Sequence, residues 1–515
     1  MQFIVQADGQ PVHVGSEALV LEAGDWDDFG FRTSFTLWYR NSTDLRNLGY
    51  VKVAVAGQER GPHPFQYGTY YDPPAGPIFS LGLSDGYYDN IRKLGSEKRV
   101  EILHTLGDLA YSLDRFEEAK THEVVRTSLL RSVEEQTVRV QFNRIARGGA
   151  RLSEYRFSYV GPSQDADNRL RFDVTPDTRP SSNVHVIIGR NGVGKTHLLR
   201  RLASAVVRPD MHEQFGRVTM SPTSTSPVGE RFVNVVSVTF SAFDPFTTVE
   251  TLGRPGVPLP PNAVAYTYVG LHRSARTTGG LETPQHERLR SDFRDAIAHV
   301  RQAHNFSSWR RAVLTLGRDP QFAETAIASY AGNMRAGMKI MNSHLDALSD
   351  AFGRLSSGHA IVVLTMTELV GRVAEQSLVL VDEPETHLHP PLLASFVQAI
   401  SDLLTERNGV AVIATHSPVV LQTVPRSCVY KLIRHGDASR VERPQIETYG
   451  ENVGVLTHEV FGLEVMQSGF YSEIADAVAQ RDSYEEVLAH FGGNLGGEAK
   501  GLVRILLSEK RDGLL

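Results

Sequence analysis

Residues 183–203 decide the fold class and read Asn183-Val-His-Val-Ile-Ile-Gly189-Arg-Asn-Gly-Val-Gly-Lys195-Thr196-His-Leu-Leu-Arg-Arg-Leu-Ala203. The run that leads to Gly189 is apolar enough for a buried parallel strand, and the run that follows Thr196 has the pattern of a helix. Between them, Gly189 to Thr196 fits G-x-x-x-x-G-K-[ST] in the strand–turn–helix context that this pattern requires. We therefore predict a phosphate-binding loop, or P-loop.

The P-loop pattern assigns a role to each part of the turn. Glycines let the backbone wrap the phosphates, so that successive N–H groups and the helix N-terminus face the negative charge. Lys195 is expected to reach the β- and γ-phosphates of a nucleotide, and the Thr196 hydroxyl to bind Mg²⁺. The predicted nucleotide-binding residues here are Gly189, Arg190, Asn191, Gly192, Val193, Gly194, Lys195 and Thr196. The alternative is a chance glycine turn between a strand and a helix.

An acidic pair follows a second apolar run, Ser377-Leu-Val-Leu-Val-Asp382-Glu383-Pro384. A P-loop needs a carboxylate for the metal and a group that activates water. We expect Asp382 to hold Mg²⁺, directly or through water, and Glu383 to orient or deprotonate the attacking water. The alternative is an ordinary strand that ends in a solvated acidic turn.

Two further motifs are weak when they stand alone. Arg354-Leu-Ser-Ser-Gly-His359 precedes an expected helix over residues 360–373, so Ser356 and Gly358 could offer a hydroxyl and backbone donors to a phosphate. The same residues are also typical of a plain helix cap. His416, in Ala414-Thr-His-Ser-Pro418, follows an apolar strand and is expected near the γ-phosphate. A lone histidine is more often structural, so the prediction for His416 depends on its position relative to the other motifs.

The chain resembles ABC-type ATPases in the order of four motifs, which are the P-loop, residues 355–358, Asp382-Glu383-Pro384 and His416. Asp382-Glu-Pro-Glu-Thr-His-Leu-His-Pro390 resembles the soluble RecF/SMC/OLD-like group rather than transporter subunits. The resemblance covers about residues 152–449 and implies ATP and Mg²⁺ as cofactors. It also implies that Ser356 and Gly358 act on the nucleotide of a partner's P-loop, that His416 is the switch histidine, and that Glu385 to His389 form the loop crossing a dimer interface.

One position departs from the family pattern. ABC proteins carry a glutamine at the end of the strand after the P-loop helix, but here residues 233–240 run into Ser241-Ala-Phe-Asp244 without one. Ser241 and Asp244 are the candidates to serve the metal and water. His387 and His389 raise the alternative of a metal pair, although no third ligand lies near them in the sequence.

Composition excludes several protein classes. Of the 515 residues 41% are hydrophobic and 22% charged, which is ordinary globular usage and excludes a disordered or fibrous chain. Lys plus Arg is 53 against 59 for Asp plus Glu, so the net charge of -6 gives no overall basic signal for nucleic acid. The single cysteine, Cys428, fits a reducing compartment. With no secretory signal or membrane-length apolar run, we expect a soluble, cytoplasmic protein without a membrane partner.

The fold class expected is α/β: a P-loop ABC-type ATPase core with a mixed or parallel sheet, a helical signature lobe, and an N-terminal extension with strands and helices. In that extension we predict strands at 35–40, 50–55 and 138–142, an irregular loop at 61–77, and helices from Lys98 to about Glu135. The predicted domains are an N-terminal extension (1–150), the P-loop half of the core (151–280), a helical lobe with the signature motif (281–360), the Walker B and switch-histidine half (361–450) and a C-terminal helical region (451–515).

The leading functional hypothesis is an ATP hydrolase whose dimer controls DNA or a partner effector, with bacterial anti-phage defence as the family-level implication. A homodimer or higher oligomer and a separate nuclease or toxin are the expected partners. An ABC transporter subunit and a slow-turnover, nucleotide-gated scaffold are the alternatives. The sequence does not decide DNA binding: the arginines of residues 281–320 are interspersed with acidic residues, and this pattern fits a solvated helical face better than a DNA-binding surface.

Overall fold

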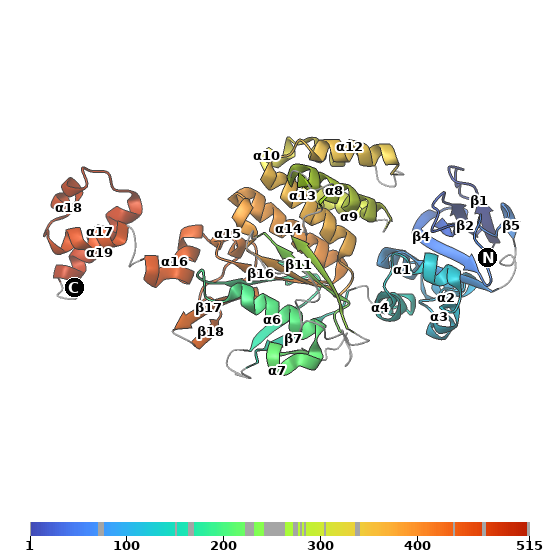
Figure 1. Ribbon diagram of the computed structural model, residues 1–515, viewed down its shortest axis with the longest axis horizontal. Coiled ribbons are helices and arrows are strands. Elements are labelled where there is room, and N and C mark those ends of the chain that lie inside the picture. The colour runs from blue at the N-terminus through green and yellow to red at the C-terminus, as the bar shows by residue number, and fades with distance from the viewer. Residues whose placement is uncertain are drawn as a thin grey trace.

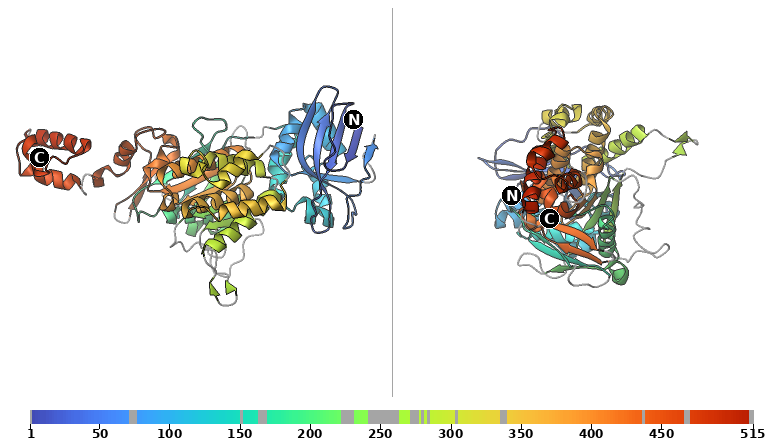
Figure 2. Two further views of the ribbon diagram at one scale, coloured as in Figure 1. Left: turned by 90° about the horizontal axis from the view of Figure 1, so that it is seen from above. Right: turned by 90° about the vertical axis from the view of Figure 1, so that its left-hand side faces the viewer.

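The computed structural model describes residues 2–70, 77–149, 152–162, 169–221, 231–240, 263–270, 277–278, 281–282, 285–302, 305–334, 340–435, 438–465 and 470–511. Figure 1 shows a central α/β part, with a module of strands and helices at the N-terminal end and a small helical module at the C-terminal end. The two chain termini lie at opposite ends of the long axis (Figures 1 and 2).

The central sheet has seven strands in the order β12-β11-β15-β16-β9-β17-β18. Neighbours from β12 to β17 run parallel, and only β18 is antiparallel to its neighbour. Every residue of β9, β15 and β16 is buried, because both faces of the sheet are covered. This confirms the predicted α/β fold class. The strands are β12 (Ala265–Gly270), β11 (Asn234–Thr239), β15 (Leu378–Asp382), β16 (Val410–Thr415), β9 (Val184–Ile188), β17 (Val429–His435) and β18 (Ala438–Glu442).

Different layers cover the two faces of the central sheet (Figure 1). On one face, α6 (Lys195–Val207) and an antiparallel sheet of β10 (Arg217–Ser221), β7 (Tyr155–Val160) and β8 (Leu170–Val174) share a core with the sheet. The opposite face carries the helical layer and a second core. Its helices are α8 (Gln285–Gln302), α9 (Phe306–Leu316), α10 (Pro320–Ala323), α11 (Ala326–Asn333), α12 (Asn342–Phe352), α13 (Ser357–Arg372) and α14 (Pro390–Arg407).

The N-terminal module has its own core of buried residues, built on a six-stranded mixed sheet in the order β5-β1-β2-β3-β4-β6. The strands predicted at 35–40 and 50–55 are confirmed, and a short strand, β5, lies in the expected loop. The strands are β1 (Gln2–Gln6), β2 (Ala18–Ala23), β3 (Ser34–Arg40), β4 (Leu45–Val55), β5 (Gly68–Tyr70) and β6 (Ile78–Gly82). The α-helices of this module are α1 (Asp85–Arg92), α2 (Ser96–Thr105), α3 (Leu113–Ala119), α4 (Glu135–Thr137) and α5 (Asn143–Ala146).

The strand predicted at 138–142 is wrong. Val138–Phe142 is a π-helical turn that continues α4 and leads into α5. Buried pairs recur every four residues, at 137–138, 141–142 and 145–146, which is a helical period and not the alternation of a strand. The β-branched and aromatic residues of this stretch therefore pack against the N-terminal core as one face of a helix.

The N-terminal module contacts the central part beside the amino-terminal ends of the central strands, whereas the P-loop lies at their carboxyl ends. Arg144 forms an ion pair with Glu375, which precedes β15, and Arg407, at the end of α14, lies 3.7 Å from Asp85. Both contacts lie where strands enter the sheet, whereas the P-loop follows the carboxyl end of β9.

The C-terminal residues form short helices, as predicted. After α15 (Pro418–Leu421) and α16 (Val453–Val465), the helices α17 (Phe470–Ala479), α18 (Tyr484–His490) and α19 (Gly497–Arg511) enclose a separate small core. The buried residues of that core include Ile474, Val487 and Val503.

Candidate nucleotide site

The predicted P-loop joins β9 to α6, as the sequence pattern requires. Gly192 and Gly194 have φ angles of 79° and 101°, and no neighbouring atom lies within 4 Å of where their β-carbons would be. Glycine is the residue that adopts such angles without strain, so these two positions allow the loop to turn its N–H groups toward one centre. Helix α6 begins at Lys195, so its N-terminus faces the same centre.

Lys195 and Thr196 occupy the first two positions of α6. The Lys195 ammonium donates to the carbonyl oxygens of Gly189 and Arg190, at 2.9 and 2.8 Å, so the side chain lies folded over its own loop. Burial lowers the pKa of Lys195, and the charges of three nearby carboxylates oppose that shift. These carboxylates belong to Glu383, Glu385 and Asp382. The lysine charge is therefore placed between the loop and an acidic segment, where phosphates can take over its hydrogen bonds.

The structure brings the P-loop and the acidic strand end together. The Thr196 hydroxyl donates to Oδ2 of Asp382, the last residue of β15, at 2.7 Å. A hydroxyl and a carboxylate oxygen at this separation are the hard oxygen ligands that Mg²⁺ prefers. Thr196 and Asp382 therefore fit a magnesium ion, which would supply positive charge beside a bound phosphate.

Glu383 has an unusual backbone conformation. Its φ and ψ are 47° and 55°, in the left-handed region, and its N–H donates to the carbonyl oxygen of Ala414 at 2.9 Å. A non-glycine residue in this region costs energy and needs support from its surroundings. The left-handed turn ends β15 and starts a 3₁₀ turn at Pro384–His387, directly after the metal-binding candidate Asp382.

His416 follows β16 and is held by Glu385. Oε1 of Glu385 accepts from the His416 N–H at 2.6 Å and from the Thr415 hydroxyl at 2.7 Å, and it lies 3.0 Å from His416 Nδ1. The resemblance placed Glu385 only in the interface loop and gave it no contact with His416. The only sequence signal for Glu385 is that it is a charged residue two positions after Glu383.

Ser356 and Gly358 lie at the start of α13, on the face of the sheet opposite to α6. The observed helix begins at Ser357 and not at Ala360, and Ser356 is its N-cap, whose hydroxyl accepts from the His359 N–H at 3.4 Å. The helix-cap alternative is therefore realised in this chain.

The two histidines of the alternative metal pair have other neighbours. His389 Nε2 lies 3.0 Å from Oδ2 of the buried Asp319, which links the segment Glu385 to His389 to the helical lobe. Within the described ranges, no group of three or more His, Cys, Asp or Glu side chains is arranged to hold a metal ion.

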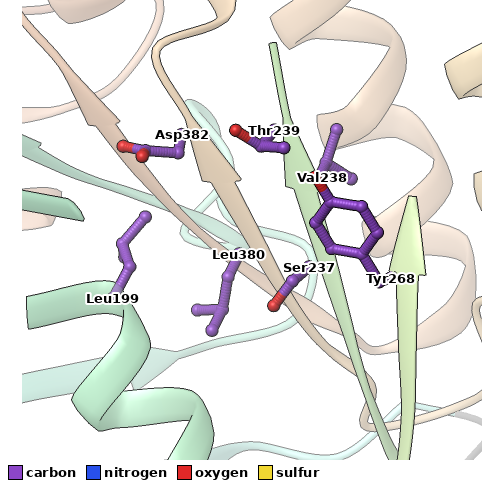
Figure 3. A pocket seen from close by; sticks show the side chains of 7 residues that line it. All are labelled: Leu199, Ser237, Val238, Thr239, Tyr268, Leu380 and Asp382. Carbon is purple, nitrogen blue, oxygen red and sulfur yellow. The ribbon is translucent and has the colours of Figure 1, made fainter. Parts of the chain in front are cut away.

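A small cavity adjoins Asp382 between α6 and the sheet (Figure 3). Its volume is about 20 Å³, which is room for a water molecule and not for a nucleotide base. Thr239 pairs with Asp382 in the strand register, and its hydroxyl lies on the side of Asp382 (Figure 3). The lining residues are Leu199, Ser237, Val238, Thr239, Tyr268, Leu380 and Asp382.

Thr239 ends the strand after which an ABC protein carries its glutamine. The alternative residues Ser241 and Asp244 lie outside the described residues, so their roles stay a prediction. Sequence reasoning missed Thr239 and Tyr268, because their nearness to Asp382 depends on the order of the strands β12, β11 and β15.

Arginines of the helical lobe make contacts within the chain. Five of those at residues 288–318 bond to acidic, amide or carbonyl groups of the same chain. These pairs fit the solvated helical face that was one of the two sequence interpretations. The pairs are Arg290–Asp350, Arg294–Asp346, Arg301–Asn342, Arg310–Ala331 and Arg311–Glu406.

Among the described residues, no helix has the length and apolar character to cross a membrane.

Comparisons with known proteins agree with this geometry. Residues 288–422 match the family AAA_21, described as "AAA domain, putative AbiEii toxin, Type IV TA system". The match spans the helical lobe, Ser356, Gly358, Asp382, Glu383 and His416, and the P-loop precedes it. Together the match and the P-loop identify a P-loop ATPase domain, while the ABC-type assignment and the narrower OLD-like grouping stay predictions.

Similar structures and sequences were also found. A chain titled "An inward-facing conformation of a putative metal-chelate type ABC transporter" is 14% identical, with a TM-score of 0.27. The match covers 60% of this chain and 89% of that chain. Protein ea59 of Escherichia phage lambda is 36% identical over 532 residues, which cover 99% of this chain and 98% of that protein. At this identity and coverage, the chain belongs to the same protein family as Protein ea59 of Escherichia phage lambda.

Proposed function

We propose that this chain binds ATP with Mg²⁺, hydrolyses it at sites shared between two copies, and uses the cycle to control a separate effector protein or DNA. The observation that carries the proposal is the 2.7 Å contact between Thr196 and Asp382, next to the ammonium of Lys195. This contact joins the phosphate loop to an acidic strand end, which is the arrangement that a P-loop hydrolase needs.

Each residue of the site has a role in this proposal. The loop N–H groups and Lys195 hold the phosphates, while Thr196 and Asp382 hold Mg²⁺, which supplies positive charge to the phosphate oxygens. Glu383 orients and deprotonates the attacking water, and its left-handed backbone turn directly follows Asp382. His416 lies at the end of β16, the strand next to β15, and bonds to the γ-phosphate.

The location of α13 supports a shared site. In this proposal Ser356 and Gly358 act on the nucleotide of a second copy, in line with the packing of α13 on the other face of the sheet from α6. In this proposal the segment Glu385 to His389 forms part of the contact between the two copies.

The flanking modules support a role in controlling another molecule. Both have cores of their own and lie outside the central sheet. A nucleotide cycle changes a partner only if the partner binds the two states differently. We infer that these modules dock an effector, a nuclease or toxin, in bacterial defence against phage. The phage lambda relative and the toxin–antitoxin description of the matched family are the observations that favour a phage-related setting.

Nucleotide binding tests the proposal directly. Titration with a fluorescent ATP analogue and Mg²⁺ should give saturable binding, and Lys195→Ala should weaken it by roughly tenfold or more, because one charge–phosphate contact is lost. Light scattering with ATP should detect a dimer. Equal binding by wild type and Lys195→Ala, with both proteins folded, would contradict the assignment of the P-loop.

Phage challenge tests the proposed output. Cells that express this chain alone are compared with cells that also express its genomic neighbour. Protection or growth arrest that requires both proteins supports a separate effector. Full protection, or toxicity, by this chain alone contradicts that division of labour.

A further inference from the structure

We propose that Glu385 is a positioning residue that fixes the imidazole of His416 for its contact with the nucleotide. The inference rests on the proposed ATP hydrolysis and adds a residue to it. Glu385 lies two positions after Glu383, in the turn Pro384–His387, and it is distinct from both the metal-binding and the water-activating carboxylates.

The contacts of Glu385 converge on one short segment. A single oxygen, Oε1, bonds to the Thr415 hydroxyl at 2.7 Å and to the His416 N–H at 2.6 Å, and lies 3.0 Å from Nδ1 of the His416 ring. The Glu385 side chain is 9% exposed, whereas that of His416 is 43% exposed. A mostly covered carboxylate therefore holds the exposed residue His416 at both its backbone N–H and its ring.

This anchor decides which ring nitrogen can meet a ligand. A carboxylate only accepts hydrogen bonds, so Nδ1 of His416 must carry the proton in this contact. The ring is then held by Nδ1, and Nε2 is the nitrogen that remains for a phosphate oxygen. Because that oxygen also only accepts, Nε2 must carry a proton as well when it donates to the phosphate. Without Glu385, His416 would keep its chemical group but lose a defined ring orientation.

Glu385 also ties the histidine to the water-activating candidate. The same turn is bonded to β16 a second time, by the Glu383 N–H and the carbonyl oxygen of Ala414 at 2.9 Å. Two sets of hydrogen bonds therefore join the turn after β15, which carries Glu383, to the end of β16, which carries His416. We expect Glu385 to act on the rate of hydrolysis rather than on the binding of ATP, because its contacts orient the groups that act after binding.

Steady-state kinetics with paired variants test this inference. Glu385→Ala should lower kcat by roughly 10- to 100-fold and leave KM within about threefold, as expected for a lost orientation. Glu385→Gln keeps an acceptor oxygen at the same place and should recover most of kcat. Combining Glu385→Ala with His416→Ala should lower kcat no further than His416→Ala alone, because the two residues act as one unit.

Glu447 offers a matched control. Its Oε1 also accepts three hydrogen bonds, from the N–H groups of Arg426, Thr448 and Tyr449, at 2.7, 2.9 and 3.3 Å. Glu447→Ala therefore removes a similar anchor elsewhere on the chain and should leave kcat unchanged. If Glu385→Ala fails to fold, Glu385→Asp takes its place in the same cycle, because the shorter side chain withdraws the carboxylate from Nδ1 of His416; it should lower kcat in wild type but not in His416→Ala.

The outcomes separate this inference from the proposed function. A wild-type protein that does not hydrolyse ATP contradicts the proposed function, and this inference falls with it. A hydrolysing wild type whose Glu385→Ala variant has normal kcat, or whose kcat losses at Glu385 and His416 multiply in the double variant, contradicts the inference alone.

Discussion

The α-carbon of Gly358 lies against the backbone carbonyl of His387, so that a β-carbon on Gly358 would be 2.9 Å from that oxygen. The contact joins the first turn of α13 to the turn that carries Glu385. Real β-carbons essentially never approach a backbone oxygen this closely, so any larger residue must move one of the two segments. Gly358 therefore has a packing role within its own chain, in addition to the proposed contact with a partner's nucleotide.

Gly358→Ala should lower ATP turnover by at least about tenfold, because a displacement of about an ångström in a catalytic segment is enough for such a loss. The matched control is Gly332→Ala in α11, where no atom lies within 4 Å of the added carbon. That change should leave turnover intact and raise stability by about 0.4–1 kcal/mol. Normal turnover in Gly358→Ala would show that the two segments move apart without consequence.

Mixed dimers test whether the sites are shared. Lys195→Ala and Ser356→Arg should each abolish turnover, and mixing them should restore part of it, since one of the two sites in a heterodimer then has an intact P-loop and an intact α13. Ser356 is also an N-cap, so its replacement costs about 0.5–2 kcal/mol of stability. Ser483→Arg removes the comparable cap of α18 and should keep turnover on its own. Heterodimers that form and remain inactive would argue against shared sites.

Stability should depend on pH through His185, the second residue of β9. The side chain is 1% exposed, and burial together with the charge of Arg443 lowers its pKa to about 3. Between about pH 6.5 and 3 the unfolded chain binds a proton that the folded chain does not, so stability falls as the pH falls through this range. Thermal unfolding should therefore show a larger drop from pH 7.5 to 4.5 in wild type than in His185→Leu. Replacement of the exposed His13 by leucine serves as control, and equal drops in all three proteins would contradict the prediction.

The convergence of the candidate site residues at neighbouring strand ends was largely predictable, because the motifs are short and each combines a strand end with particular residue types. The P-loop, Asp382-Glu383 and His416 all follow apolar runs that became adjacent parallel strands. Val138–Phe142 was not predictable from residue types, since valine and phenylalanine suit a strand and a buried helix face equally. The contacts of Glu385 with His416, and of Gly358 with His387, depend on which strands and turns become neighbours, and local sequence patterns do not contain that information.

Phosphate release by wild-type protein and Glu383→Gln, measured with saturating ATP and Mg²⁺, tests the central claim most directly. Glu383 follows the metal-binding candidate Asp382, and glutamine keeps its shape but cannot accept a proton from water. We predict that the variant binds ATP as tightly as wild type, accumulates as an ATP-bound dimer, and turns over at least about 100-fold more slowly. A Glu383→Gln protein that hydrolyses ATP at the wild-type rate would contradict the account.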